Sequence, residues 1–211
     1  MRMRKKPNLV PRMERCAPIA EAHPEENRGQ WLASFPGYSA LHLELGCGKG
    51  RFTADMAELN PNIFFVAVEK VPDAVVVGME RVFDRGLHNV RFISRDAAAL
   101  DEFFAPGEIA RIYINFPDPW HKARQYKRRL TAPGFLKTYA GLLSPGGEIW
   151  FKTDNVPLFA WSQEQFCENG WTLREVTDDL HAGGCQGIMT DYEVKFHAQG
   201  VKINRLVAVR P

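Results

Sequence analysis

The feature that most constrains the fold is a glycine-rich segment placed directly after a short alternating run. Residues 41–45 alternate apolar and polar side chains as a β-strand does, and Gly46, Gly48 and Gly50 follow at once. Apolar residues then recur at helical spacing in residues 52–59. A strand, a glycine turn and a helix in this order begin an α/β sheet, and ligands of such sheets bind beside that turn, at the carboxyl ends of the strands.

The rest of the chain continues this alternation. Short β-branched and aromatic runs predict strands, and amphipathic segments between them predict helices. The pattern indicates an α/β fold with a mostly parallel sheet and helices on both faces. The expected strands cover residues 63–68, 90–93, 109–114, 148–151, 171–176 and 201–209, and the expected helices cover residues 75–83 and 156–168.

The length and composition predict one domain preceded by an arm. A chain of 211 residues that is 45% hydrophobic can build one sizeable core, which we expect in residues 31–211. Residues 1–30 are rich in Pro, Arg and Glu, a composition that predicts a flexible basic arm, poorly ordered without a partner.

The composition also disfavours several classes of protein. Apolar runs are far too short to span a bilayer, and no apolar stretch follows the basic first residues as in a secretory signal. Cys16, Cys47, Cys167 and Cys185 are widely spaced and form no C-x-x-C pair, so we expect no metal site and no disulfide framework. The expected setting is a reducing cytoplasm, with no membrane partner, and the chain is compatible with a monomer or a homodimer.

Basic residues are concentrated in two stretches, although the net charge is only +2. Residues 1–15 carry six basic side chains against the single acid Glu14, and residues 119–147 contain no Asp or Glu. Such local fields favour a polyanion such as nucleic acid, although a solvated loop is the commoner meaning of any single run. The basic residues of the second stretch are Lys122, Arg124, Lys127, Arg128, Arg129 and Lys137.

An acid stands at the end of each of the first three expected strands. Glu44 precedes the glycines, Glu69 ends the second strand and Asp96 follows the third. The glycine spacing is G-x-G-x-G, whereas the dinucleotide fingerprint is G-x-G-x-x-G, and an acid beside a pyrophosphate is unfavourable. The acids suit a cationic ligand such as S-adenosylmethionine, with Glu69 on the ribose hydroxyls and Asp96 near the adenine amine. Any one of them could instead cap a helix.

Three later polar clusters follow expected strands or turns. Residues 115–122 contain two prolines that stiffen the loop and hold Asp118 at a strand end, followed by Trp120, which can stack on a base or in the core. Residues 152–155 contain Asp154 and Asn155, either of which could cap the next helix. Residues 190–193 could be an exposed turn.

Residues 45–50, 115–120, 127–130, 151–155 and 190–193 together resemble the bacterial tRNA (guanine-N7)-methyltransferase family. The resemblance runs from about Trp31 to the C-terminus in the order of the family. It implies a Rossmann-like class I methyltransferase fold, S-adenosylmethionine as cofactor, and tRNA as partner, methylated at N7 of a guanine in the variable loop. The proposed catalytic residue of the family falls on Asp118.

The remaining roles implied by the resemblance concern cofactor and substrate. The cofactor-binding acids are Glu44, Glu69 and Asp96, with Asp118 at the same site. Gly46, Gly48 and Gly50 are expected to bind the cofactor because the glycine turn lets the backbone come close to a ligand. The substrate-binding positions are Lys122, Asp154 and residues 190–193, which include Thr190, Tyr192 and Glu193. Arg124, Arg128 and Arg129 are expected to face the RNA because of their place in the basic stretch, not because of the resemblance.

Three alternatives stay open from the sequence. An enzyme that methylates an exocyclic amine, on adenine or on a protein glutamine, uses a loop with two prolines after the acid, whereas a single proline follows Asp118 here. An RNA-binding module of the same fold could have lost activity, which intact acids at three strand ends argue against. A nicotinamide dehydrogenase is disfavoured by the glycine spacing.

Overall fold

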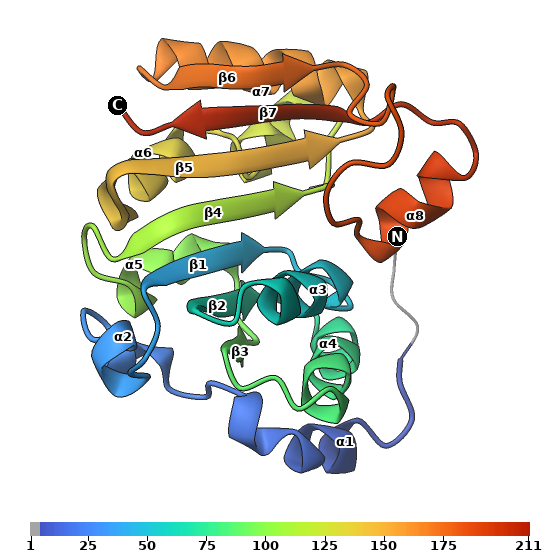
Figure 1. Ribbon diagram of the computed structural model, residues 1–211. Coiled ribbons are helices and arrows are strands. Elements are labelled where there is room, and N and C mark those ends of the chain that lie inside the picture. The colour runs from blue at the N-terminus through green and yellow to red at the C-terminus, as the bar shows by residue number, and fades with distance from the viewer. Residues whose placement is uncertain (1–4) are drawn as a thin grey trace.

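The computed structural model describes residues 5–211 and shows a seven-stranded sheet in the order β3-β2-β1-β4-β5-β7-β6 (Figure 1). Strands β1 to β5 pair in parallel, and β7 runs antiparallel to both β5 and β6. The predicted, mostly parallel sheet is confirmed. The strands are β1 (Ala40–Leu45), β2 (Ile63–Val68), β3 (Val90–Ile93), β4 (Ile109–Asn115), β5 (Leu143–Thr153), β6 (Thr172–Thr177) and β7 (Asn204–Val209).

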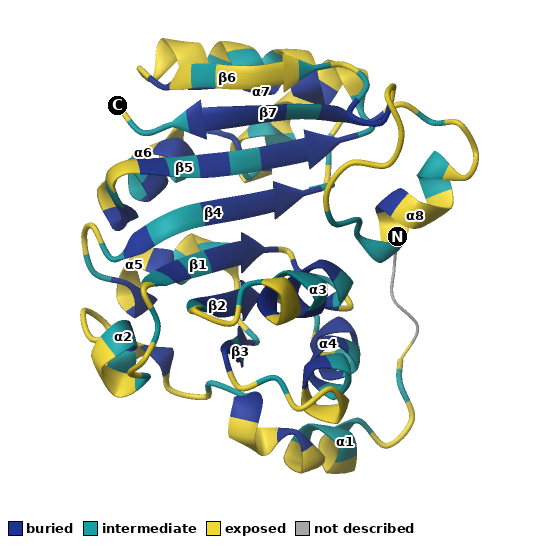
Figure 2. Cartoon of the chain, viewed as in Figure 1, coloured by how far each residue is buried: buried dark blue, intermediate teal, exposed yellow. Residues whose placement is uncertain are grey.

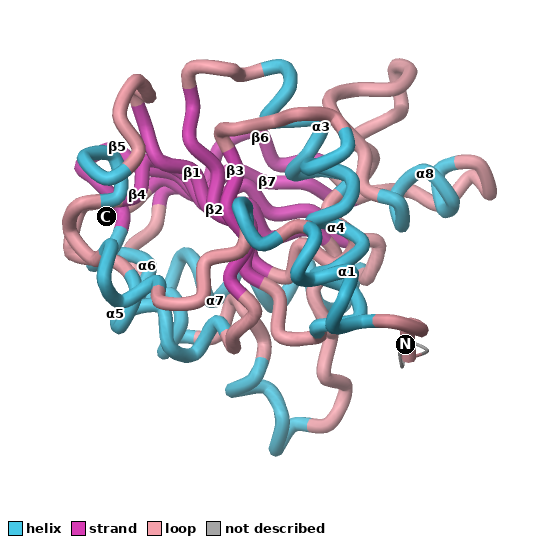
Figure 3. Tube along the Cα trace, turned by 90° about the horizontal axis from the view of Figure 1, so that it is seen from below, coloured by secondary structure: helices cyan, strands magenta, loops and turns pink. Residues whose placement is uncertain are grey.

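Helices cover both faces of the sheet, with α1, α3 and α4 on one side and α5, α6 and α7 on the other (Figures 1 and 3). None of the helices in residues 5–211 has the length and apolar composition needed to cross a bilayer. The α-helices are α1 (Leu9–Arg15), α2 (Trp31–Ser34), α3 (Arg51–Leu59), α4 (Pro72–Asp84), α5 (Leu100–Phe103), α6 (Pro133–Leu142), α7 (Val156–Glu168) and α8 (Asp191–His197); short 3₁₀ turns lie at Ala17–Ile19, Pro24–Asn27, Ala97–Ala99 and Ala123–Arg128.

The core lies in two layers separated by the sheet. One layer packs side chains of α5, α6 and α7 against the strands, and the other packs α3 and α4 against the opposite face. Strand β2 is buried from Phe64 to Val68 because helices cover both of its faces, which explains its unbroken apolar sequence. Figure 2 shows the same distribution, with the central strands buried and the outer helix surfaces exposed.

The N-terminal segment differs from the expectation of a poorly ordered arm. Helix α1 packs against α4, where Arg12 pairs with Glu80 at 2.6 Å and Arg15 pairs with Asp84 at 2.7 Å. Cys16 is fully buried in the core layer next to α4. The composition predicted disorder because it does not show contacts with the rest of the chain. A few apolar side chains and the complementary charges on α4 are sufficient to hold the N-terminal segment against that helix. Residues 1–4, which include part of the predicted basic arm, lie outside the described residues.

Strands β5 and β7 and helix α8 also differ from the prediction. Strand β5 begins at Leu143, before the expected residue 148, and β7 begins at Asn204, after the expected residue 201. Helix α8 lies in a stretch that showed no apolar periodicity; it begins with a capping box between Thr190 and Glu193. Helix α7 spans the predicted residues, and the side chain of Asn155 accepts the N–H of Leu158 at 2.8 Å, so Asn155 is the helix cap.

Candidate active site

A cavity of about 1040 Å³ lies at the carboxyl ends of β1, β2 and β4, with α8 beside it. Glu44, Glu69, Asp96 and Asp118 all line this cavity, so the predicted acids gather along one edge of the sheet.

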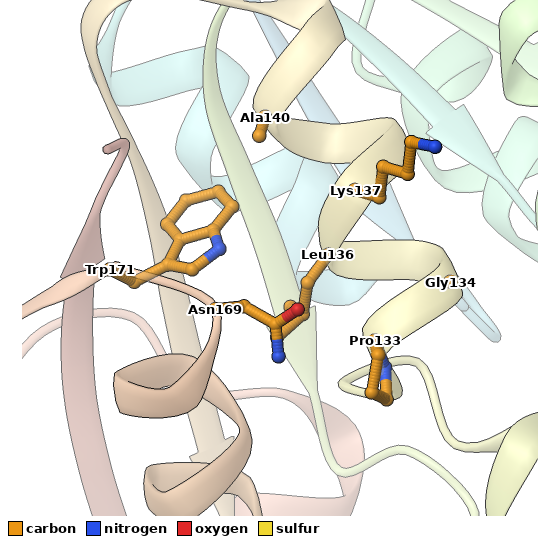
Figure 4. Close-up of a pocket in the computed structure, with 7 residues that line it drawn as sticks. All are labelled: Pro133, Gly134, Leu136, Lys137, Ala140, Asn169 and Trp171. Atoms are coloured by element: carbon orange, nitrogen blue, oxygen red, sulfur yellow. The ribbon is translucent and has the colours of Figure 1, made fainter.

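A smaller hollow of about 450 Å³ lies between α6 and the α7–β6 turn (Figure 4). Its only ionisable lining residue is Lys137, so the chemistry belongs to the larger cavity.

Glu44 forms the floor of the cavity at the end of β1. It is only 2% exposed, and its carboxylate accepts hydrogen bonds from the Thr53 hydroxyl and, at 3.0 Å, from the Asn115 amide. Burial raises the pKa of Glu44, and these two hydrogen bonds oppose the rise. Glu44 therefore connects α3, through Thr53, to Asn115 at the end of β4.

The glycine turn presents bare backbone to the cavity. Gly46 and Gly48 have φ angles of 72° and 54°, line the cavity, and would each direct an added Cβ into open space. Gly50, also predicted to bind cofactor, does not line the cavity. A Cβ on Gly50 would lie 2.7 Å from the Cα of Gly78, so this glycine permits the close approach of α3 to α4.

Glu69 and Asp96 combine a local structural role with exposure to the cavity. Glu69 accepts N–H groups from Gly48 at 3.2 Å and from Val71 at 2.9 Å, which links the glycine turn to the end of β2. Asp96 caps a short 3₁₀ turn by accepting the N–H of Ala98 at 3.0 Å. Asp96 is therefore a cap, which is one of the two roles that the sequence left open. Its carboxylate nevertheless lines the cavity.

The acceptor loop, residues 115–120, leaves β4 with an unusual backbone. Phe116 and Trp120 adopt left-handed φ angles of 51° and 41°, which non-glycine residues rarely do. Between them, the exposed carboxylate of Asp118 lies on the cavity wall. Strained backbone conformations persist where surrounding contacts enforce them, often at functional sites.

The basic run after this loop divides into exposed and buried members. Lys127 and Arg128 are exposed and line the cavity, and the Arg128 guanidinium lies 5.1 Å from the centre of the Trp120 ring. Lys122 and Arg124 are exposed outside the cavity. Arg129 differs from the expectation of an RNA contact: it is 5% exposed and lies beneath the acceptor loop.

Helix α8 brings the last predicted cluster to the cavity. Thr190 and Tyr192 line it, and the Tyr192 ring packs between Phe116, with ring centres 5.0 Å apart, and Phe196, at 4.1 Å. The Tyr192 hydroxyl donates to Asp154 at 3.0 Å, and burial together with this bond raises the pKa of Tyr192 to about 12. Asp154 therefore reaches the cavity only through Tyr192.

Glu193 differs from its predicted role in substrate binding. The side chain is fully buried, and its two oxygens meet Lys152 Nζ at 2.5 Å and His181 Nε2 at 3.0 Å. A side chain without exposed surface cannot contact a substrate in this arrangement. The sequence prediction also missed several cavity residues: Lys49, Arg51, Lys70, Arg95, Asn115, Phe116, Lys195 and Phe196. Those next to the strand ends could have been found from their position alone.

Comparison with known proteins assigns the chain to a family. Residues 39–206 match the family model Methyltransf_4, described as "Putative methyltransferase". The chain belongs to this methyltransferase family. No group of three or more His, Cys, Asp or Glu side chains within residues 5–211 is arranged to hold a metal ion.

Solved structures similar to the methyltransferase share its fold. The 16S rRNA methyltransferase KamB superposes with a TM-score of 0.65 at 18% identity, over 83% of this chain and 90% of the other. The aminoglycoside resistance methyltransferase NpmB1 gives 0.61 at 18% identity, over 86% and 92%. A Haemonchus contortus phosphoethanolamine N-methyltransferase 2, solved with S-adenosyl-L-methionine, gives 0.53 at 13% identity, over 83% and 50%. The fold is the Rossmann-like class I methyltransferase fold.

Family and fold support S-adenosylmethionine as the cofactor of the methyltransferase. The residues present fit this molecule. The open backbone at Gly46 and Gly48 admits close approach by a ligand, and the carboxylates of Glu69 and Asp96 offer acceptors for hydroxyl and amino groups. The acidic edge also complements a cation, because Glu44 and Glu69 line the same part of the cavity as the glycine turn.

Proposed function

We propose that this methyltransferase transfers a methyl group from S-adenosylmethionine to N7 of a guanine in tRNA. The observation that carries the proposal is the position of Asp118, whose exposed carboxylate lies on the wall of the same cavity as Glu69 and Asp96. The exposed basic residues Lys127 and Arg128 line that cavity too. Acceptors for a cationic methyl donor and cations for a polyanionic substrate therefore meet at one site.

The proposed reaction requires no general base in the protein. S-adenosylmethionine supplies an electrophilic methyl group bound to a sulfonium sulfur. Guanine N7 has a lone pair at neutral pH, so no side chain needs to remove a proton before attack. The protein must instead hold the base in line with the methyl group, which is an effect of proximity and orientation.

Asp118 has two proposed tasks in this reaction. Its carboxylate can accept hydrogen bonds from the N1–H and the N2 amine of guanine, a donor pair that adenine lacks. Methyl transfer also moves positive charge onto the guanine ring, and a fixed carboxylate stabilises that charge as it develops. The aromatic rings of Trp120 and Tyr192, both on the cavity wall, provide surfaces on which a base can stack.

The basic residues are assigned to the phosphate backbone. Lys122, Arg124, Lys127 and Arg128 are exposed, and they continue along the protein surface from the acceptor loop. Phosphate contacts of this kind position an RNA without reading its sequence. They would bring the target guanine to the cavity, where Asp118 selects it.

The deciding experiment identifies the methylated nucleoside. The protein is incubated with labelled S-adenosylmethionine and, in separate reactions, with bulk tRNA and with 16S rRNA, and the digested RNA is analysed by mass spectrometry. The proposal expects N7-methylguanosine in tRNA alone. N6-methyladenosine would support the exocyclic-amine alternative, label in rRNA alone would change the substrate, and cofactor binding without methylation of either RNA would support an inactive RNA-binding module.

A further inference from the structure

Arg129 is the buried member of an otherwise exposed basic run. Its neighbours Lys127 and Arg128 are exposed, whereas Arg129 is 5% exposed. Its Nε donates to the carbonyl of Pro119 at 2.8 Å, and its Nη2 donates to the carbonyl of Trp120 at 3.4 Å. A cation in this position is held by the protein and is not presented to solvent.

Two aromatic rings complete the environment of the Arg129 guanidinium. Its Cζ lies 3.6 Å from the centre of the Tyr126 ring and 4.4 Å from that of Trp161, and Trp161 belongs to α7. Planar guanidinium stacks on aromatic faces while its edge forms directed hydrogen bonds, which an ammonium group cannot do in the same way. Arg129 therefore connects the acceptor loop to α7 in the helical layer.

The acceptor loop needs such an external support. Pro117 and Pro119 have no backbone N–H, so they cannot donate to neighbouring backbone. At the start of the loop, the N–H of Phe116 binds the carbonyl of Lys152 at 2.8 Å. At its end, the carbonyls of Pro119 and Trp120 accept from Arg129. Asp118 lies between these two sets of hydrogen bonds. Phe116 and Trp120, on either side of it, have left-handed φ angles.

We propose that Arg129 is a positioning residue that fixes the acceptor loop and thereby the Asp118 carboxylate. It is not one of the residues that bind RNA phosphates. The catalytic consequence rests on the function proposed above, because it concerns the guanine that Asp118 would hold. The structural consequence does not, because it concerns only the conformation of residues 115–120.

The first experiment tests the conformation without any substrate. The protein has five tryptophans, so incorporation of 5-fluorotryptophan gives five ¹⁹F resonances, which single Trp→Phe variants assign. In Arg129→Lys and Arg129→Met, the Trp120 resonance should shift and broaden, while those of Trp31 and Trp171 stay unchanged and report an intact fold. A Trp120 resonance identical to wild type in both variants would overturn the proposal.

If Arg129→Met does not fold, a milder variant keeps the proposal testable. Tyr126→Leu removes one of the two aromatic faces and leaves the Arg129 guanidinium in place. The proposal expects a smaller shift of the same Trp120 resonance. No change in that resonance would overturn it.

The second experiment separates positioning from RNA binding. Turnover at saturating tRNA and the salt dependence of RNA affinity are measured for Arg129→Lys, Arg129→Met and the matched control Arg128→Met. The proposal expects both Arg129 variants to lose at least about tenfold in kcat with the salt slope of wild type, whereas Arg128→Met flattens the log–log slope by roughly 0.7–0.9. Full turnover in Arg129→Lys together with a flattened slope in Arg129→Met would make Arg129 a phosphate contact. If wild type itself methylates no tRNA, the ¹⁹F experiment still decides the conformational role.

Discussion

Lys152 at the end of β5 and Glu193 in α8 form a buried ion pair, with Nζ 2.5 Å from Oε2 and side chains that are 9% and 0% exposed. Lys152 also donates to the carbonyl of Ile188 at 3.0 Å. His181 Nδ1 accepts the N–H of Gln186 at 3.2 Å, so its other nitrogen, Nε2, carries the proton that is donated to Glu193. This network fastens α8, and with it Tyr192, to the sheet.

Removal of the Glu193 charge should destabilise the protein strongly. Glu193→Leu leaves the Lys152 ammonium buried without its ion-pair partner, at an expected cost of about 3–5 kcal/mol in the free energy of unfolding. The matched control is Glu175→Leu, because Glu175 pairs with Arg205 at 2.5 Å but is 60% exposed, so its loss should cost less than about 1 kcal/mol. Urea denaturation measures both values, and equal losses would contradict the buried role of Glu193.

The close approach of α3 and α4 should make Gly78 intolerant of a methyl group. A Cβ on Gly78 would lie 2.9 Å from Cε1 of Phe92 and 3.2 Å from the Cα of Gly50. Gly78→Ala is therefore expected to cost about 1–3 kcal/mol by overpacking. Gly141 in α6 has open space around the same position, so Gly141→Ala should stabilise by roughly 0.4–1 kcal/mol. Thermal denaturation should move the two melting temperatures in opposite directions, and a shared direction would refute the packing argument.

His42 should make the protein sensitive to acid. Burial, assisted by the neighbouring charge of Arg111, lowers the pKa of His42 from 6.5 to about 4. As the pH falls, the unfolded chain binds this proton first, so the contribution of His42 is intact above pH 6.5 and is lost progressively towards pH 4, up to about 3 kcal/mol. His42→Gln should flatten the dependence of unfolding free energy on pH in this window, while the exposed control His88→Gln keeps it. Identical slopes in all three proteins would contradict the pKa assignment.

The sequence predicted the sheet and its acidic edge because both depend on local patterns. Alternation and helical spacing identify strands and helices, and the carboxyl ends of parallel strands meet at one edge. Glu44, Glu69 and Asp118 could therefore be placed at one cavity from their positions at the carboxyl ends of β1, β2 and β4, and all three line that cavity.

The remaining parts depend on contacts between residues far apart in the chain. The partner of Glu193 is Lys152, 41 residues away, and Arg129 stacks on Trp161 of α7. No local pattern distinguishes a buried arginine or glutamate from an exposed one in a polar stretch. Helix α8 was missed for a related reason, since its position depends on these long-range bonds and on a short capped turn rather than on apolar periodicity.

Glu69 should affect the binding of the cofactor more than the chemical step. Its carboxylate accepts the N–H groups of Gly48 and Val71, and it lines the part of the cavity that is proposed to bind the cofactor. Glu69→Ala is expected to raise the Kd for S-adenosylmethionine by roughly 10–100-fold, because it removes charge-assisted hydrogen bonds and loosens the glycine turn. Calorimetry measures this value directly. Cofactor affinity equal to wild type would place the ligand elsewhere in the cavity.

Asp118 should affect turnover on tRNA more than the binding of the cofactor. Its exposed carboxylate is proposed to meet the guanine and the charge that develops on it, so Asp118→Ala should lower kcat on tRNA by about 10²–10³-fold. Cofactor affinity should stay close to wild type, because Glu69, which joins the glycine turn to the end of β2, remains in place. Asp118→Asn keeps the size of the side chain but places an amide where a carboxylate meets guanine donors, and it should be nearly as inactive. Asp101→Asn removes an exposed carboxylate in α5, away from the cavity, and serves as the control for the loss of a surface charge.

Wild-type methylation by Asp118→Ala would mean that the guanine is held by other residues and that the acceptor loop serves only to shape the cavity.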